Sequence, residues 1–121
     1  MYEGKRDIRD YLNDMSDMLI NLQEFVDGMT FEEFREDTKT VFAVIRAFEV
    51  LGEAAKHLPQ EYRDQHQDVP WQKIIALRNK LIHEYFAINI DIVWNTIQND
   101  IPELQTIITP VVKECFESYK P

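Results

Sequence analysis

The sequence predicts an all-α fold, an up-and-down bundle of four to five helices in a single domain over residues 1–121. Apolar residues recur at three- and four-residue steps over long stretches, which is the period of one helix face. The chain has only 3 glycines, so tight β-hairpins would lack the residues that their turns need. It has no internal repeat, low-complexity tract or linker that would divide it.

The first helix is expected over residues 7–26. Its apolar side chains fall on one face: Ile8, Tyr11, Leu12, Met15, Leu19, Leu22 and Val26. Asp27 and Gly28 should end this helix. Thr30 and Glu33 then fit a capping box that opens a short helix toward Asp37.

The second long helix is expected over residues 38–58 and should end before Pro59. Its apolar face contains Val41, Val44, Ile45, Phe48, Leu51, Ala55 and Leu58. Its polar face contains Arg46, Glu49, Glu53 and Lys56. Gly52 costs about 1 kcal/mol relative to alanine inside a helix. A second helix that approaches closely at this position would explain why a glycine is present.

The third long helix should begin at Pro70 and Trp71, after a short helix with loops over residues 59–69. It should continue to about residue 85, and residues 86–90 should form a loop. Asn89 is a suitable cap for a helix over residues 90–98.

The last helix is expected to start anew at the segment Asp100-Ile101-Pro102-Glu103, which has a proline in the first turn and an acid at the third position. Pro110 should bend this helix or mark its restart, because proline lacks the N–H that the helix interior requires.

The net charge of −9 argues against non-specific binding to a nucleic-acid backbone, which normally needs a basic surface. Any activity on RNA must therefore depend on a local site or on a partner. One stretch is locally basic, because Lys73, Arg78 and Lys80 are accompanied only by Glu84 between Trp71 and Phe86.

We expect the chain to stay in a reducing cytoplasm. Cys115 is the single cysteine, so no disulfide can form within the chain, and we expect this residue to pack near the C-terminus. We also expect no membrane segment, because there is no leader-like start and no run of about 18 apolar residues.

Arg78 has an unusual position on the third long helix. On a wheel at about 100° per residue, the side chains within about 60° of Arg78 are apolar or aromatic: Ile74, Ile75, Leu81, Ile82 and Tyr85. Burying a guanidinium is costly unless it is paired. We therefore expect Arg78 to meet an acid from the second long helix, or an anion that arrives as a ligand.

The third helix is expected to bury two sides. Ile74, Leu77 and Leu81 would face the core. A second side with Ile75, Arg78, Ile82 and Tyr85, flanked by Asn79 and His83, would line a cleft or a subunit contact. Asn79 and His83 fall about 100° and 140° from Arg78 on the same wheel.

Arg78 and His83 are the candidate catalytic residues. A guanidinium can hold a phosphate with two hydrogen bonds, and an imidazole can exchange a proton near neutral pH. Together they suit RNA cleavage by its own 2′-hydroxyl, which requires no metal, and Asn79 could orient the imidazole or hold a phosphate oxygen. An Arg–acid bridge and a core histidine would explain the same pattern without any chemistry.

The remaining polar residues have simpler interpretations. His57, His66 and His83 are spaced too irregularly for a zinc site, so no metal and no other cofactor is expected. Glu49 and Glu53 lie one turn apart, and one or both should balance Arg46 or Arg78. Arg46 and Glu53 are therefore supporting candidates for the site.

Four ordered blocks of the sequence resemble a known family. The segment Arg78-Asn79-x-x-x-His83-x-Tyr85 is similar to the Arg–polar–x(4–6)–His signature of the HEPN superfamily. Three further segments resemble the HepT-like toxins: residues 44–56 (VIRAFEVLGEAAK), the segment Pro70-Trp71-x-x-Ile74 and residues 91–94 (DIVW). The resemblance covers nearly the whole chain.

The resemblance implies a HEPN-type bundle that forms a homodimer, with the two motifs facing a shared cleft where RNA is cut without metal. It implies that Arg78 and His83 are the catalytic pair and that Asn79 supports them. It further implies a toxin–antitoxin pair, in which a minimal nucleotidyltransferase antitoxin attaches AMP to Tyr85. The bulk and negative charge of AMP there would block the cleft around Arg78.

Two other hypotheses remain open from the sequence. The chain could be a non-catalytic helical binding module that partners and regulates a nucleotidyltransferase. Alternatively, its RNA-cutting activity could be a vestige, with modification of Tyr85 as the main signal.

Overall fold

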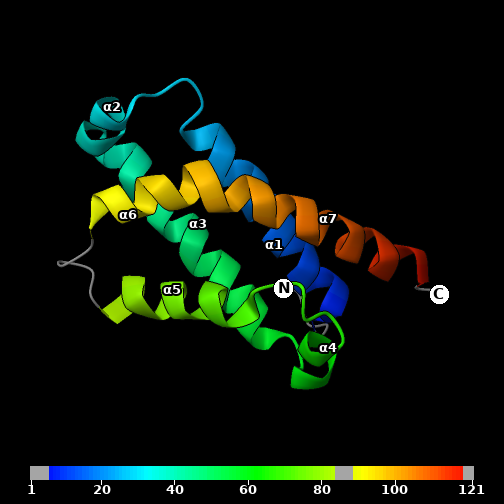
Figure 1. The fold of residues 1–121 in the computed structure, drawn as a ribbon. Coiled ribbons are helices and arrows are strands. Elements are labelled where there is room, and N and C mark those ends of the chain that lie inside the picture. The colour runs from blue at the N-terminus through cyan, green and yellow to red at the C-terminus, as the bar shows by residue number, and fades with distance from the viewer. Residues whose placement is uncertain (1–5, 84–88, 119–121) are drawn as a thin grey trace, which may run out of the picture.

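The structure is a computed structural model that describes residues 6–83 and 89–118. Every regular element in these residues is helical, which confirms the predicted all-α class. The long helices α1 (Ile8–Phe25), α3 (Thr38–His57), α5 (Trp71–His83) and α7 (Ile101–Ser118) alternate in direction (Figure 1). Helix α1 packs against α3 and α7, and α5 packs against the other side of α3. None of the described helices is long and apolar enough to cross a membrane.

Side-chain caps determine where the first three helices begin. Asp7 accepts hydrogen bonds from the backbone N–H groups of Arg9 and Asp10 and thereby caps α1. Thr30 and Glu33 form the predicted capping box of α2 (Phe31–Glu36). Asp37 caps α3, and the hydrogen bond from the Thr40 N–H lowers the pKa of its carboxyl. The predicted starts of these helices are confirmed.

The start of α5 is fixed by a tryptophan. The short helix α4 (Gln60–Asp64) and the loop after it lead to Trp71, which is 6% exposed. The Trp71 indole Nε1 donates to the carbonyl oxygens of Arg63 at 3.2 Å and His66 at 3.0 Å. These bonds tie the incoming loop to the first residue of α5.

The last part of the fold departs from the sequence prediction. Asn89 caps α6 (Ile90–Asn95) as expected, but α6 continues through a π-helical turn (Thr96–Asp100) directly into α7. The predicted new start at Asp100 was wrong in this respect. Pro102 has no N–H and its ring would clash with a carbonyl one turn earlier, and a wider π turn relieves that conflict without a break. Pro110 likewise lies inside α7, where it is exposed and does not restart the helix.

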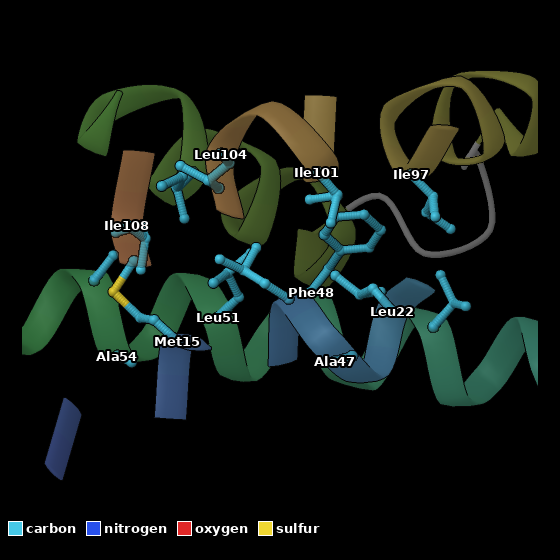
Figure 2. Close-up of a cluster of buried hydrophobic side chains, with 14 of the residues drawn as sticks. Met15, Leu22, Ala47, Phe48, Leu51, Ala54, Ile97, Ile101, Leu104 and Ile108 are labelled. Atoms are coloured by element: carbon cyan, nitrogen blue, oxygen red, sulfur yellow. The ribbon is translucent and has the colours of Figure 1, made fainter. Parts of the chain in front are cut away.

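The core lies between α1, α3 and α7. Figure 2 shows Met15 and Leu22 of α1 meeting Phe48 and Leu51 of α3, with residues of α7 closing over them. Phe48 and Leu51 are each 2% exposed. Helix α5 adds Trp71, Ile74 and Leu81 from its side of α3. Because α5 rests mainly on α3, much of its surface stays outside the core.

Candidate active site

Helix α5 passes over α3 at Gly52, very close to Arg78. A Cβ atom built on Gly52 would collide with Cβ of Arg78 and lie 2.7 Å from its Cγ. The same Cβ would lie 3.2 Å from the backbone oxygen of Ile74. This confirms the prediction that another helix approaches closely at Gly52, and the stem of Arg78 is what occupies the space.

Two side chains hold the guanidinium of Arg78. Nη2 donates to Glu53 Oε2 at 2.6 Å, and Nη1 donates to Asn79 Oδ1 at 2.8 Å. The side chain of Arg78 is 18% exposed and that of Glu53 is 47% exposed. The expected acidic partner from the second long helix is therefore Glu53, the residue that follows Gly52.

Glu49, the neighbouring acid on α3, pairs with Arg46. Glu49 lies one turn before Glu53 on α3, and its Oε1 is 3.6 Å from Nη1 of Arg46. The side chain of Arg46 is 75% exposed, so this pair contributes little to stability. Each carboxylate thus balances one arginine, as predicted.

Arg78 lines a hollow between α1, α3 and α5 that has a volume of about 500 Å³. Its walls are formed by Arg6, Tyr11, Asp14, Arg46, Glu49, Val50, Glu53, Ala54, His57, Arg78 and Ile82. Three arginines and three carboxylates occur among these residues. The hollow is therefore close to neutral at pH 7, whereas the whole chain has a net charge of −9.

The two predicted sides of α5 are present in part, because Ile75, expected on the second side, packs against the core and does not line the hollow. Ile74 and Leu81 are buried against the core, while Ile82 on the second side is 40% exposed and borders the hollow. Arg78 also lies on this second side. A single copy of the chain thus leaves this side of α5 only partly covered.

His83 is the last residue of α5 and is exposed. The reading of this residue as a core histidine is therefore wrong. Arg78 and His83 are about 140° apart around the helix, and His83 is not among the residues that line the hollow. The structure brings Arg78, Asn79 and Glu53 into direct contact and places His83 one turn beyond Asn79, in solvent. Tyr85 lies outside the described residues.

The guanidinium retains hydrogen-bonding capacity for an anion. It has five N–H bonds, of which Glu53 and Asn79 take one on each terminal nitrogen. The Nε atom is buried and makes no hydrogen bond to the described residues. These two bonds leave one hydrogen on each terminal nitrogen, and Arg78 lines the hollow, where a phosphate oxygen could accept such hydrogens.

Tyr11 and His57 line the hollow but were not predicted as site residues. The rings of Tyr11 and His57 are stacked, with centroids 5.1 Å apart and planes 16° apart. The sequence predicts Tyr11 only as part of an apolar helix face, and it predicts no role for His57 beyond excluding a zinc site. It follows Glu53 by one helical turn, and this spacing could have indicated that it shares the polar face of α3.

Cys115 contacts Tyr62 and is not part of this site. Burial raises the pKa of the Cys115 thiol. Burial, with the neighbouring Cys115, also raises the pKa of Tyr62 to about 12. A thiol whose pKa is raised remains protonated at neutral pH, which fits the expected packing role.

Comparison with known proteins identifies the family. The model of a family described as "Ribonuclease HepT-like" matches residues 15–111. A protein from Thermococcus cleftensis named "Probable ribonuclease HepT" is 42% identical over 84% of this chain and 92% of its own length. A protein from Methanocaldococcus jannaschii named "Putative RNase" is 43% identical over 91% of this chain and 94% of its own length.

A third relative, also named "Putative RNase", comes from Caldanaerobacter subterraneus subsp. tengcongensis. It is 42% identical over 88% of this chain and 95% of its own length. No solved structure matches the chain. The family match and these identities over most of each chain agree with the all-helical fold. The chain belongs to the HepT-like ribonuclease family.

Proposed function

We propose that the chain is a metal-independent endoribonuclease in which Arg78 and His83 are the catalytic pair. The observation that carries this proposal is the way Arg78 is held. Glu53 and Asn79 fix its partly buried guanidinium at the wall of an open hollow. Fixed donors aimed at one place are what stabilisation of growing negative charge requires.

The proposed reaction uses the 2′-hydroxyl of the RNA as its nucleophile. The imidazole of His83 takes the proton of this hydroxyl, and the 2′-oxygen then forms a bond to the adjacent phosphorus. The bond from phosphorus to the 5′-oxygen breaks, the leaving oxygen takes up a proton from water, and the His83 imidazolium returns its proton to solvent. The products are a 2′,3′-cyclic phosphate and a 5′-hydroxyl. Arg78 binds the non-bridging oxygens and stabilises the charge that grows on them.

Three residues support this pair in the proposal. Asn79 accepts a hydrogen bond from Arg78 and lies one helical turn before His83 on α5. Glu53 fixes the direction of the Arg78 guanidinium. Arg46 lies on the same hollow with a largely exposed side chain and could contact a neighbouring phosphate.

We further propose that the active form is a homodimer in which the two motifs face one cleft. The partly uncovered second side of α5, with Ile82 at 40% exposure, supports this assembly. So does the angular separation of Arg78 and His83, because one helix does not aim both side chains in the same direction. In a shared cleft, two copies of each group would surround the RNA.

The biological role that we propose is that of a cytoplasmic toxin in a toxin–antitoxin pair. A minimal nucleotidyltransferase antitoxin would neutralise it by attaching AMP to Tyr85, two residues after His83. A bulky anion at that position would compete with RNA phosphate for Arg78. The acidic surface of the chain, with its net charge of −9, would suit a partner that has a basic groove.

One observation favours a second candidate function. Both terminal nitrogens of Arg78 already have partners within the chain, as in a purely structural ion pair. This arrangement would also suit a non-catalytic binding module that regulates a nucleotidyltransferase. Such a module would bind its partner tightly and would not cut RNA.

RNA cleavage in EDTA separates these functions. Purified wild-type protein should cut a single-stranded RNA in excess EDTA and leave 2′,3′-cyclic phosphate ends. A matched substrate with 2′-deoxynucleotides at the cut positions should stay intact, because it lacks the nucleophile. Intact RNA under all conditions, or cleavage of the 2′-deoxy substrate, would contradict the proposed chemistry.

The modification is tested separately by mass spectrometry. Protein co-expressed with the nucleotidyltransferase should gain one AMP per chain, and the Tyr85→Phe variant should gain none. Unmodified wild-type protein, or AMP on another residue, would contradict the proposed role of Tyr85.

A further inference from the structure

We propose that the hollow beside Arg78 is a nucleotide-binding subsite, in which an RNA base stacks on the ring pair of His57 and Tyr11 while its phosphate lies at Arg78. The inference rests on the proposed ribonuclease function. It names the part of the substrate that this face of the chain holds.

The ring pair is already arranged as a stacking platform. Tyr11 of α1 and His57 of α3 lie almost parallel, at 5.1 Å between centroids. The guanidinium carbon of Arg6 lies 4.9 Å from the centroid of Tyr11, so a planar cation extends the stack. The side chain of His57 is 47% exposed, and the Nδ1 atom lies 2.8 Å from the Glu53 carbonyl oxygen, which fixes the ring. Flat, oriented and solvent-accessible rings are what unpaired RNA bases stack on.

The carboxylate of Glu53 contacts both the His57 ring of the platform and the guanidinium of Arg78. Glu53 Oε2 is 2.6 Å from Nη2 of Arg78, and Glu53 Oε1 is 3.7 Å from Nδ1 of His57. The guanidinium and the imidazole therefore flank the same side chain and line the same hollow. One nucleotide could therefore contact both groups, with its phosphate at Arg78 and its base at His57.

The charges of the hollow also permit an anionic ligand. Its three arginines offset its three carboxylates, while the chain as a whole repels RNA with a net charge of −9. Among the described residues, Arg46 pairs with Glu49 at 3.6 Å with its own side chain 75% exposed, and this kind of pair is readily exchanged for a phosphate contact. The hollow is thus one of the places on an acidic protein where an RNA strand is not repelled.

A second Tyr–His pair shows what a structural stack looks like in this chain. The rings of Tyr62 and His66 are 4.4 Å apart and 27° from parallel. The side chain of His66 is only 16% exposed, and the backbone carbonyl oxygen of His66 accepts a hydrogen bond from the indole of Trp71. Neither residue lines the hollow that contains Arg78. This pair is a matched internal control for the exposed one.

The test compares substitutions of His57 that keep or remove a flat ring. Single-turnover cleavage of a short RNA, measured over a range of enzyme concentrations, gives the half-saturating concentration and the limiting rate separately. His57→Leu should raise the half-saturating concentration about tenfold, the effect expected for the loss of one stacked base, and change the limiting rate less than about twofold. His57→Phe should bind RNA as the wild type does. His66→Leu, which removes the ring of the control pair, should leave RNA binding unchanged in protein that melts as a folded domain.

A substrate with a single abasic nucleotide next to the cut identifies the base itself. Wild type should lose about tenfold in affinity for this RNA, and His57→Leu should lose little more, because both changes remove the same contact. Equal effects of His57→Phe and His57→Leu would overturn the inference, since they would show that the imidazole acts through charge or a proton. So would unchanged RNA affinity of His57→Leu.

Direct binding of a fluorescent oligonucleotide keeps this test independent of the proposed function. A wild-type chain that binds the RNA without cutting it would contradict the ribonuclease mechanism, while the His57 variants would still decide the subsite. A chain that cuts RNA with no dependence on His57 would contradict the subsite alone. A chain that does not bind RNA at all would contradict both.

Discussion

The stem of Arg78 occupies the space that a side chain on Gly52 would fill. Its Cβ and Cγ atoms lie against the bare backbone of α3, and the next residue of that helix, Glu53, takes the Nη2 atom at 2.6 Å. One dipeptide on α3 therefore determines both how close α5 comes and where the guanidinium points. The position of the candidate site depends on this contact between two helices.

Gly52→Ala should destabilise the protein, although alanine normally favours a helix over glycine by about 1 kcal/mol. The added Cβ would meet Cβ of Arg78 and the backbone oxygen of Ile74 at 3.2 Å, and neither atom can move without shifting α5. Overpacking of this kind costs about 1–3 kcal/mol. Urea unfolding should show a lower midpoint than wild type, and RNA cleavage should fall as Arg78 is displaced. A midpoint at or above that of wild type would show that the contact is not tight.

Glu53→Gln should lower the limiting rate of RNA cleavage about tenfold, because a guanidinium without its carboxylate partner is held less firmly in the direction that the phosphate needs. The half-saturating RNA concentration should not rise, since the substitution removes a negative charge beside the phosphate. Glu49→Gln, one turn away and paired with exposed Arg46, is the matched control and should change both quantities less than about twofold. A faster Glu53→Gln enzyme would instead identify Glu53 as a competitor of the phosphate.

The stability of the protein should fall at high pH through Tyr62. Burial is the first cause that raises its pKa to about 12 in the fold, from an ordinary value of about 10. The fold therefore favours the protonated phenol. This contribution is complete below about pH 10 and is lost as the pH rises toward 12. Urea unfolding at several pH values should show a steeper loss of stability in this range for wild type than for Tyr62→Phe, and equal slopes would contradict the assignment.

Phe48→Ala should be among the most destabilising single substitutions. Phe48 is 2% exposed at the centre of the core shown in Figure 2, and truncation of a buried phenylalanine to alanine costs about 3–5 kcal/mol. Phe116, near the end of α7, is 45% exposed. Phe116→Ala should therefore shift the thermal midpoint only slightly. Similar shifts for the two variants would mean that the core is not organised around α3.

Local signals in the sequence predicted much of the fold. The capping box of Thr30 and Glu33 and the three- and four-residue spacing of apolar side chains act within one or two helical turns. The run from α6 to α7 was not predicted, because Pro102 after Asp100 is typical of a helix start. The π turn that admits this proline depends on the packing of both flanking helices, and such packing leaves no local signature.

The candidate site was only partly predictable for a related reason. The apolar surroundings of Arg78 on the wheel showed that an acid should meet it. The choice of Glu53 over Glu49 depends on the register between α3 and α5, which the close contact at Gly52 fixes. The stack of Tyr11 on His57 joins residues 46 positions apart in the sequence and requires α1 and α3 to be packed first.

The catalytic pair is the central claim, and the cleavage rate of its alanine variants tests it most directly. Arg78→Ala and His83→Ala should each lower single-turnover RNA cleavage in EDTA by at least about a hundredfold while the thermal midpoint shows a folded protein. Arg35→Ala, which removes an exposed guanidinium that does not line the hollow, is the matched control and should retain most of the activity. Full activity in folded Arg78→Ala or His83→Ala protein would contradict the account.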